Sequence, residues 1–353
     1  MLKSKNLEIS VLDLIGKKTL DGWCLESAAT FPADHTGGYF SQCFHVTRDG
    51  HKAFLKALDL DKFDIMQLMT YFGEFKYEQD TLAVCKDGRM NRIVRLLEAG
   101  AIDRGVGFPQ AQSKVPFIVF ELAAGDIRES IDISKSIPIR WKFFVLHQTT
   151  LALMQLHRAQ IAHQDLKPSN VLRFSDNTLK LGDLGRSTQR NRPAPHDGLP
   201  RPGHINYAPF EQRYSYEAPA EWAERRISSD VFQLGTLVAY TFTSIVLPSF
   251  MLGTINSSYV PNNWGGKYAD VMPFLQDHLA RSVMEISVDL PEPFRAELVQ
   301  IILDLCHTDP LQRGKFGSKN GQPNIGPLWL QRYVARFDIL EKKAAVLASN
   351  KHA

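Results

Sequence analysis

The octapeptide HQDLKPSN at residues 163–170, followed by DLG at residues 183–185, constrains this chain more than any other feature. Two short, largely apolar stretches lie between these motifs, and the polar residues 175–178 separate them. Apolar stretches on either side of a polar turn predict a β-hairpin. Such a hairpin would bring Asp183 back beside Asn170, so that a carboxylate and an amide oxygen would lie together.

The residue types in the two motifs match the parts that phosphoryl transfer from ATP requires. Asp165 can accept the proton of an attacking hydroxyl, and Lys167 can lie beside the phosphoryl group as it moves. Asn170 and Asp183 can hold Mg²⁺ against the phosphates of the nucleotide, because Mg²⁺ prefers oxygen ligands. We therefore predict Asp165 and Lys167 as catalytic residues, and Asn170 and Asp183 as metal ligands.

The motifs resemble those of the protein kinase family in its eukaryotic-like serine/threonine form, whose pattern is H-R-D-L-x-x-x-N followed by D-F-G. Gln164 stands in place of the Arg and Leu184 in place of the Phe. The resemblance extends over about residues 22–316. It implies an α+β, two-lobed fold that forms one kinase domain and uses ATP and Mg²⁺. A small β-rich N-lobe would occupy residues 1–123, and a larger helical C-lobe would occupy residues 124–353.

The expected N-lobe contains a strong hairpin signal at residues 48–50, where Asp-Gly separates two short apolar stretches. Before it, residues 36–41 (TGGYFS) resemble the glycine-rich loop that closes over the ATP phosphates, although only Gly38 matches G-x-G-x-x-G. The resemblance implies that Gly37 and Gly38 contact ATP. It also places Lys56 where the family has its phosphate-anchoring Lys.

Residues 61–86 predict a helix that resembles the αC helix of the family. Glu78 would pair with Lys56 and orient it, and Glu74, one turn away, is the alternative partner. Phe54 occupies the position of a usual Ala near the adenine, which is a departure from the family pattern.

The stretch at residues 117–122 predicts a buried strand that runs into a hinge-like linker. The resemblance implies that backbone groups from Glu121 to Ala123 would meet the adenine. Phe120 would be the gatekeeper residue.

Three more motifs in the expected C-lobe resemble the family in order and spacing. Residues 203–211 match the frame that ends the activation segment, and Asp230 begins a motif whose Asp braces the catalytic loop in the family. Residues 309–313 resemble D-P-x-x-R, whose Arg usually pairs with the Glu that ends the activation segment. We therefore predict a buried ion pair between Glu211 and Arg313.

His204 stands where the family has a Thr that bridges the catalytic Asp and Lys. Its imidazole could hydrogen-bond Asp165 and titrate near neutral pH, or it could point to solvent.

Regulation by phosphorylation of the activation segment is not expected, because Gln164 is neutral and cannot pair with a phosphate. Between Leu184 and Glu211 the hydroxyl side chains are those of Ser187, Thr188 and Tyr207. We predict activity that does not depend on phosphorylation there. Control would come from expression, from a partner, or from residues 249–290, which resemble an insertion without a motif.

The composition sets limits on compartment and partners. The chain has 353 residues and a formal net charge of +3, which does not indicate a general nucleic-acid binder. Its four cysteines are widely spaced, which predicts free thiols in a reducing, cytoplasmic setting.

Residues 1–10 lack the apolar core of a signal peptide. Residues 231–253 are apolar but carry polar interruptions, which favours a buried helix over a membrane span.

The function predicted is transfer of phosphate from ATP to Ser or Thr hydroxyls of proteins, with autophosphorylation. Lys167, with the Pro and Ser after it, resembles the Ser/Thr-specific loop. The arginines between residues 184 and 211 would favour an acidic protein substrate, or are simply solvated. Two alternatives stay open. A pseudokinase scaffold fits the degenerate glycine loop, Phe54 and Gln164. A small-molecule phosphotransferase shares the His-x-Asp loop but lacks a Lys at the position of Lys167.

Overall fold

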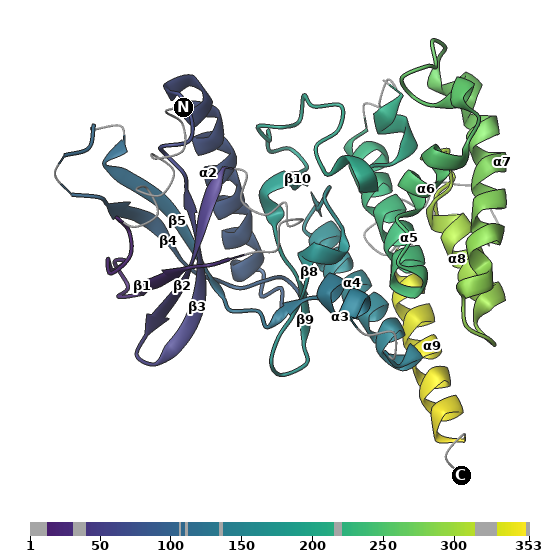
Figure 1. Ribbon diagram of the computed structural model, residues 1–353, viewed down its shortest axis with the longest axis horizontal. Coiled ribbons are helices and arrows are strands. Elements are labelled where there is room, and N and C mark those ends of the chain that lie inside the picture. The colour runs from purple at the N-terminus through teal and green to yellow at the C-terminus, as the bar shows by residue number, and fades with distance from the viewer. Residues whose placement is uncertain are drawn as a thin grey trace, which may run out of the picture. The chain divides into compact units, whose positions relative to one another are not determined.

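The computed structural model describes residues 13–30, 40–105, 107–109, 112–133, 137–214, 221–314 and 330–350. The chain divides into two compact units, Met1–Ala124 and Gly125–Ala353 (Figure 1). The first is rich in strands and the second in helices, which is the predicted α+β fold class.

The first unit is built on a five-stranded antiparallel sheet with the order β1-β2-β3-β5-β4. Its strands are β1 (Cys24–Ala28), β2 (Ser41–Arg48), β3 (His51–Leu58), β4 (Leu96–Asp103) and β5 (Lys114–Glu121). The predicted hairpin joins β2 to β3. Its turn residues Asp49 and Gly50 have φ angles of 51° and 77°, a conformation that Gly and Asp tolerate better than most residues.

The helix α2 (Ile65–Asp87) packs against strands β3, β4 and β5 (Figure 1). It begins four residues later than predicted, because Asp64 caps it and forms a reciprocal capping box with Gln67. Its buried positions include Leu68, Phe75 and Leu82, and also the carboxyl-bearing Glu78.

The second unit is largely helical. Its helices are α3 (Ile127–Ile133), α4 (Ile139–Arg158), α5 (Ser228–Thr243), α6 (Leu247–Thr254), α7 (Tyr268–Ile286), α8 (Arg295–Leu305) and α9 (Gln331–Ser349). A small sheet has the order β6-β8-β9, from β6 (Gly125–Asp126), β8 (Val171–Arg173) and β9 (Leu179–Leu181). The strands β7 (Ile161–Ala162) and β10 (Thr188–Gln189) form a second pair.

The core of the second unit is centred on α5, whose side chains from Ser228 to Phe242 are all buried. The helix α8 packs along α5, and α9 packs along α4 (Figure 1). Gly235 allows the approach of α8, because a Cβ there would lie 2.5 Å from the Cys306 Sγ. Burial on all sides explains why most residues of this helix are apolar.

Within the described residues, no helix taken singly has both the length and the apolar character needed to cross a membrane. The segments Ala223–Thr243 and Leu247–Thr254 meet that test only when they are joined, and they are bent by 87°.

Residues 249–290 differ from the expectation of an insertion. They contain most of α6 and all of α7, and α7 packs against both α6 and α8. The buried residues Val271, Leu275, Leu279 and Val283 recur every four residues, which gives α7 one apolar face. This segment is therefore part of the helical core of the second unit.

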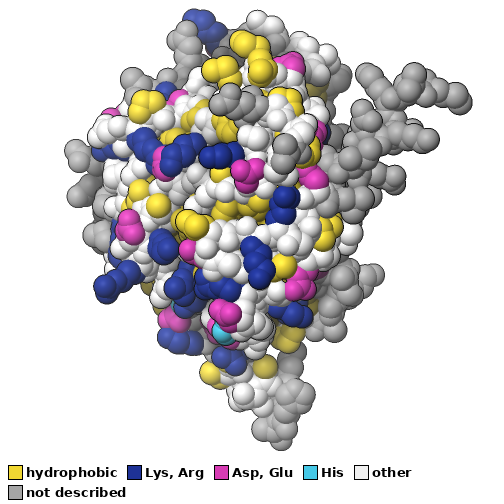
Figure 2. Space-filling model, turned by 90° about the vertical axis from the view of Figure 1, so that its left-hand side faces the viewer, with side chains coloured by type: hydrophobic (Ala, Val, Ile, Leu, Met, Phe, Trp, Pro, Cys, Tyr) yellow, Lys and Arg dark blue, Asp and Glu magenta, His cyan; other side chains and the backbone are white. Residues whose placement is uncertain are grey.

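The face of the molecule in Figure 2 mixes Lys and Arg with acidic and hydrophobic side chains. Charges of both signs agree with the small formal net charge of +3. The absence of a nucleic-acid partner stays a prediction.

Candidate active site

The predicted catalytic loop, residues 163–170, is fixed to α5 through one buried carboxylate. Asp230 Oδ2 accepts hydrogen bonds from the backbone N–H of His163 at 2.7 Å and from His157 Nε2 at 2.8 Å. Asp230 Oδ1 accepts from the backbone N–H of Gln164 at 2.7 Å and from its Nε2 at 3.0 Å. Four donors satisfy a carboxylate that is fully buried. The sequence motif predicted this bracing role for Asp230, and the contacts confirm it.

His163 connects the two sequence motifs. Its Nδ1 accepts a hydrogen bond from the backbone N–H of Asp165 at 3.2 Å, and its Nε2 lies 3.0 Å from the carbonyl oxygen of Gly182. Because Nδ1 acts as an acceptor, we assign the ring proton to Nε2, which donates to Gly182. His163 thereby ties the residue before Asp183 to the loop that carries Asp165.

The carboxylate of Asp165 is held at both oxygens. Lys167 Nζ lies 2.7 Å from Oδ2, and the backbone N–H of His204 donates to Oδ1 at 2.7 Å. Asn170 Nδ2 donates to the Asp165 carbonyl oxygen at 2.8 Å and lies 3.3 Å from Oδ2. Asp165 is 4% exposed, so its direction is set by these contacts rather than by solvent.

The predicted hairpin is present and places Asp183 beside Asn170. Strands β8 and β9 pair with Val171 opposite Leu181, and the backbone N–H of Gly182 donates to the Asn170 carbonyl oxygen at 2.9 Å. Asp183 has φ of 58° and ψ of 72°, a left-handed conformation that Asp tolerates better than most residues.

These two residues fit a magnesium ion that is carried by a nucleotide. Asn170 uses its Nδ2 on Asp165, so its Oδ1 is the atom left to bind a cation. No group of three or more His, Cys, Asp or Glu side chains suited to a metal occurs among the described residues. Mg²⁺ commonly takes one or two protein ligands together with phosphate oxygens, and the set here matches that pattern.

In the first unit, Lys56 Nζ lies 2.8 Å from Glu78 Oε2. The Glu78 side chain is 1% exposed and that of Lys56 is 14% exposed. The Lys56 ammonium also lies 5.4 Å from the centre of the Phe40 ring. The predicted pair with Glu78 is thus formed.

The other predicted nucleotide contacts lie at the end of β5 or outside the described residues. Glu121 is the last residue of β5, and its Oε1 accepts from the backbone N–H of Arg95 at 2.7 Å. Ala123 lies two residues further on, in the same unit, and Phe120 is 8% exposed. Gly37 and Gly38 fall outside the described residues.

The activation segment is closed by the predicted ion pair. Arg313 Nη1 and Nη2 each donate to one Glu211 oxygen at 2.6 Å, and the side chains are 0% and 8% exposed, respectively. Burial lowers the pKa of Arg313, but Glu211 opposes this effect and the net pKa is raised. The pair is therefore charged and buried, as the sequence predicted.

A family model described as protein kinase domain matches residues 37–318 of this chain. The chain belongs to the protein kinase family. Among curated relatives, this kinase is 24% identical over 212 residues to an Aurora kinase of Debaryomyces hansenii, which is 60% of this chain and 44% of that protein. It is 28% identical over 113 residues to mitogen-activated protein kinase 13 of Oryza sativa subsp. indica, 31% of this chain and 22% of that protein. The matched region therefore spans less than half the length of these relatives.

The hypothesis that the His204 imidazole bonds Asp165 is wrong for this kinase. The backbone N–H of His204 makes that bond, and its ring Nδ1 accepts from the backbone N–H of Asn206 at 3.2 Å. Gly203 allows this approach, since a Cβ there would lie 2.1 Å from the Gln164 carbonyl oxygen. Burial, and then Lys167, lower the pKa of the His204 imidazole.

Sequence reasoning did not identify Gln233 as part of this kinase's site. Its Oε1 accepts from the backbone N–H of Leu166 at 2.9 Å, and its Nε2 donates to the Gln164 carbonyl oxygen at 2.9 Å. One amide group therefore satisfies two backbone groups of the catalytic loop. The sequence feature that could have identified it is a polar residue inside a helix that is mostly apolar and buried.

Proposed function

We propose that this kinase transfers the γ-phosphoryl group of ATP to Ser or Thr hydroxyls of proteins, in a Mg²⁺-dependent reaction that includes autophosphorylation. The observation that carries the proposal is the arrangement around Asp165. The Lys167 ammonium and the Asn170 amide each lie within hydrogen-bonding distance of the Asp165 carboxylate, in a loop that buried contacts with α5 hold in place. A loop that served only as a scaffold would not require this set.

In the proposed reaction each residue would have one role. Asp165 would orient the acceptor hydroxyl and take its proton, because Lys167 and the His204 N–H fix the direction of its carboxylate. Lys167 would offset negative charge on the phosphoryl group as it moves. Asn170 and Asp183 would hold Mg²⁺, which neutralises the phosphates when it is bound. In the first unit, Glu78 pairs with Lys56 and would orient it for a phosphate.

A pseudokinase remains the second candidate, and the departures from the family pattern favour it. Phe54 lies in β3, opposite Phe120 of β5, at the position expected near the adenine. Gln164, in contrast, no longer argues for a pseudokinase, because its side chain is used fully inside the fold. We also propose that the substrate is an acidic protein and that the kinase is cytoplasmic. The location agrees with the four cysteines, which are all free thiols.

The test is phosphoryl transfer by the purified chain. The protein is incubated with γ-labelled ATP and Mg²⁺, alone and with dephosphorylated casein, and the labelled amino acids are identified after hydrolysis. We expect label on Ser or Thr, loss of that label with EDTA, and no label with Asp165→Asn. The matched control is Asp176→Asn, because Asp176 is exposed in the turn between β8 and β9 and its Oδ1 caps Thr178.

Three outcomes would count against the proposal. Label on Tyr alone would contradict the Ser/Thr assignment. Transfer by Asp165→Asn near the wild-type rate would remove the assigned base. Nucleotide binding without transfer, in a chain that is folded, would favour the pseudokinase.

A further inference from the structure

Contacts within the chain hold the activation segment, residues 184–211, in place. The strand β10 pairs with β7, and the buried His196 places its Nε2 2.8 Å from the Ser187 carbonyl oxygen. Ser187 and Thr188, the Ser and Thr residues between Leu184 and Glu211, are fully buried. Ser187 Oγ also donates to the Leu184 carbonyl oxygen at 2.7 Å. Neither hydroxyl is therefore accessible to a modifying enzyme in this conformation.

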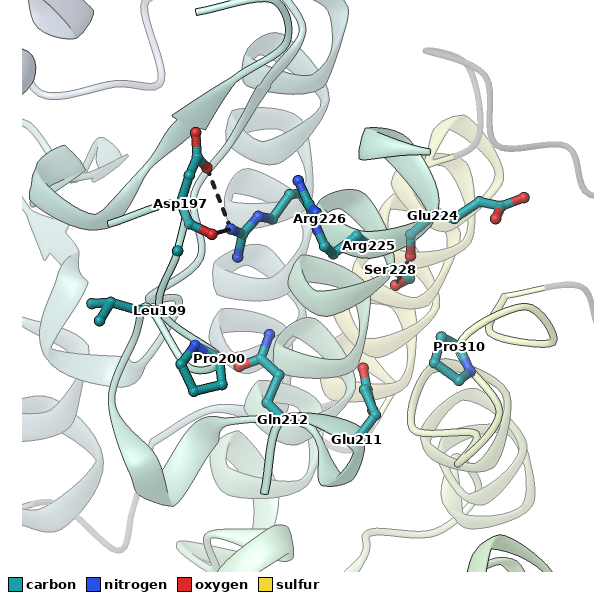
Figure 3. Close-up of a pocket in the computed structure, with 11 residues that line it drawn as sticks. Asp197, Leu199, Pro200, Glu211, Gln212, Glu224, Arg225, Arg226, Ser228 and Pro310 are labelled. Carbon is teal, nitrogen blue, oxygen red and sulfur yellow. Dashed lines mark hydrogen bonds and ion pairs between the residues drawn. The ribbon is translucent and has the colours of Figure 1, made fainter. Parts of the chain in front are cut away.

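Asp197, near the middle of this segment, forms an ion pair with Arg226, which lies just before α5. Arg226 Nη2 donates to the Asp197 carbonyl oxygen at 3.0 Å and lies 3.3 Å from its Oδ1, as Figure 3 shows. The other carboxylate oxygen of Asp197 accepts from the backbone N–H of Ala194 at 2.8 Å. The Arg226 side chain is 3% exposed and that of Asp197 is 35% exposed, so the pair joins a buried cation to the segment.

Arg226 also contacts Gln164 in the catalytic loop. Gln164 Nε2 donates to the Arg226 carbonyl oxygen at 2.8 Å, and Arg226 Nη1 lies 3.5 Å from Gln164 Oε1. Arg226 belongs to a single π-helical turn, Ala223–Ile227, that leads into α5. Turns of this kind occur frequently at functional sites. A continuous set of contacts therefore runs from Asp197 through Arg226 to the loop that carries Asp165.

A cavity lined by charged side chains lies beside the pair. It has a volume of about 220 Å³ and is lined by Arg225 and Arg226, but also by Asp197, Glu211 and Glu224. Asp197 pairs with Arg226 and Glu211 pairs with Arg313, so an added phosphate would have to displace a carboxylate that already holds its guanidinium group. The chain thus supplies the negative charge itself (Figure 3).

We propose that Asp197 is the built-in anion of the activation segment, and that Arg226 is the positioning residue through which it holds the catalytic loop. This inference rests on the proposed kinase function. A carboxylate carries one charge where a phosphate carries about 1.5 to 2, but it is present at all times. Arg226 supplies the cation that Gln164 cannot, and the Gln164 carboxamide connects it to Asp230, which holds the loop that carries Asp165. The kinase would then need no phosphorylation to order its site.

The test is a double-mutant cycle on phosphatase-treated protein, with kcat and KM measured for casein and for ATP. We expect Asp197→Asn and Arg226→Gln each to lower kcat about tenfold, with the ATP KM changed less than about twofold. The kcat of the double variant should be no lower than that of the less active single variant, because both substitutions remove the same interaction. Asp197→Glu should keep most of the activity. Asp277→Asn is the matched control, since it breaks the exposed pair with Arg281 and should change nothing.

Wild-type kcat in Asp197→Asn would overturn the inference. The inference would also be overturned if the two single losses of kcat multiplied in the double variant. A tenfold loss of kcat when the wild-type protein is treated with phosphatase would overturn it as well.

Limited proteolysis separates this inference from the proposed function. Trypsin cleavage after Arg190, which is exposed and is followed by Asn191 rather than by a proline, should be faster in Asp197→Asn than in wild type and unchanged in Asp277→Asn. Equal cleavage in all three would overturn the inference. This readout needs no catalysis, so it decides the role of Asp197 even if the wild-type chain transfers no phosphate.

Discussion

Replacing Arg313 by Ala should destabilise the second unit strongly. Arg313 donates twice to Glu211 at 2.6 Å, and its side chain is 0% exposed while that of Glu211 is 8% exposed. Its Nε also donates to the His307 carbonyl oxygen at 2.7 Å, and its guanidinium lies 4.9 Å from the Phe232 ring. The substitution removes all of these contacts and leaves the Glu211 carboxylate buried without its cation.

Breaking one side of a buried pair costs about 3–5 kcal/mol in free energy of unfolding. At roughly 2–4 °C per kcal/mol for a unit of this size, the melting temperature should fall by about 6–20 °C. Thermal and urea unfolding, followed by circular dichroism, measure the change. The matched control is Arg295→Ala, whose pair with Glu292 is 2.9 Å long but 41% and 65% exposed. An exposed pair contributes at most about 1 kcal/mol, so the control should shift little.

The double variant Glu211→Gln with Arg313→Met tests the reasoning further. It removes both charges, so it should be more stable than Arg313→Ala alone. A fall in melting temperature for Arg313→Ala no larger than that of Arg295→Ala would refute the claim that the pair is buried and charged.

Three further predictions concern the activation segment. His204→Thr should leave the shape of the pH–rate profile unchanged, because the backbone N–H and not the imidazole contacts Asp165; a shift of the profile would restore a role for the ring. Gly203→Ala should lower kcat by at least about tenfold, because its Cβ would lie 2.1 Å from the Gln164 carbonyl oxygen, and a normal rate measured with casein would contradict this close approach. Burial lowers the pKa of His196 below 6.5, so the native state binds a proton on this ring less readily than the unfolded state does. The stability that the neutral ring contributes should therefore be fully present above about pH 6.5 and should fall as the pH is lowered. His196→Gln should flatten that pH dependence in urea unfolding.

The local features of the fold could be predicted from the sequence because they depend on neighbouring residues. The Asp-Gly turn between β2 and β3 and the polar turn between β8 and β9 are present where the pattern indicated them. Spacing within one helix likewise placed Glu78 against Lys56. The boundary of α2 was missed by four residues, because the capping box at Asp64 decides where that helix begins.

Contacts over long sequence distances could be predicted only where a family motif records them. Asp230 and the Glu211–Arg313 pair were expected from such motifs, although 102 residues separate the last two. No family motif gave a role to Gln233, and its role follows only from the packing of α5 against the catalytic loop. The integration of residues 249–290 into the helical core was missed for the same reason.

The sequence by itself determined which chemical groups this chain carries and in what order: the carboxylate of Asp165, the ammonium of Lys167, and the oxygen ligands of Asn170 and Asp183. Only the tertiary structure decided which atom of each neighbour meets them. His204 uses its backbone N–H because the absent side chain of Gly203 lets the backbone come close. Arg226, distant in sequence, contacts Gln164 because a π-helical turn sets its position. Residue type fixes what a side chain can donate or accept, whereas its partner depends on chain segments that only folding brings together.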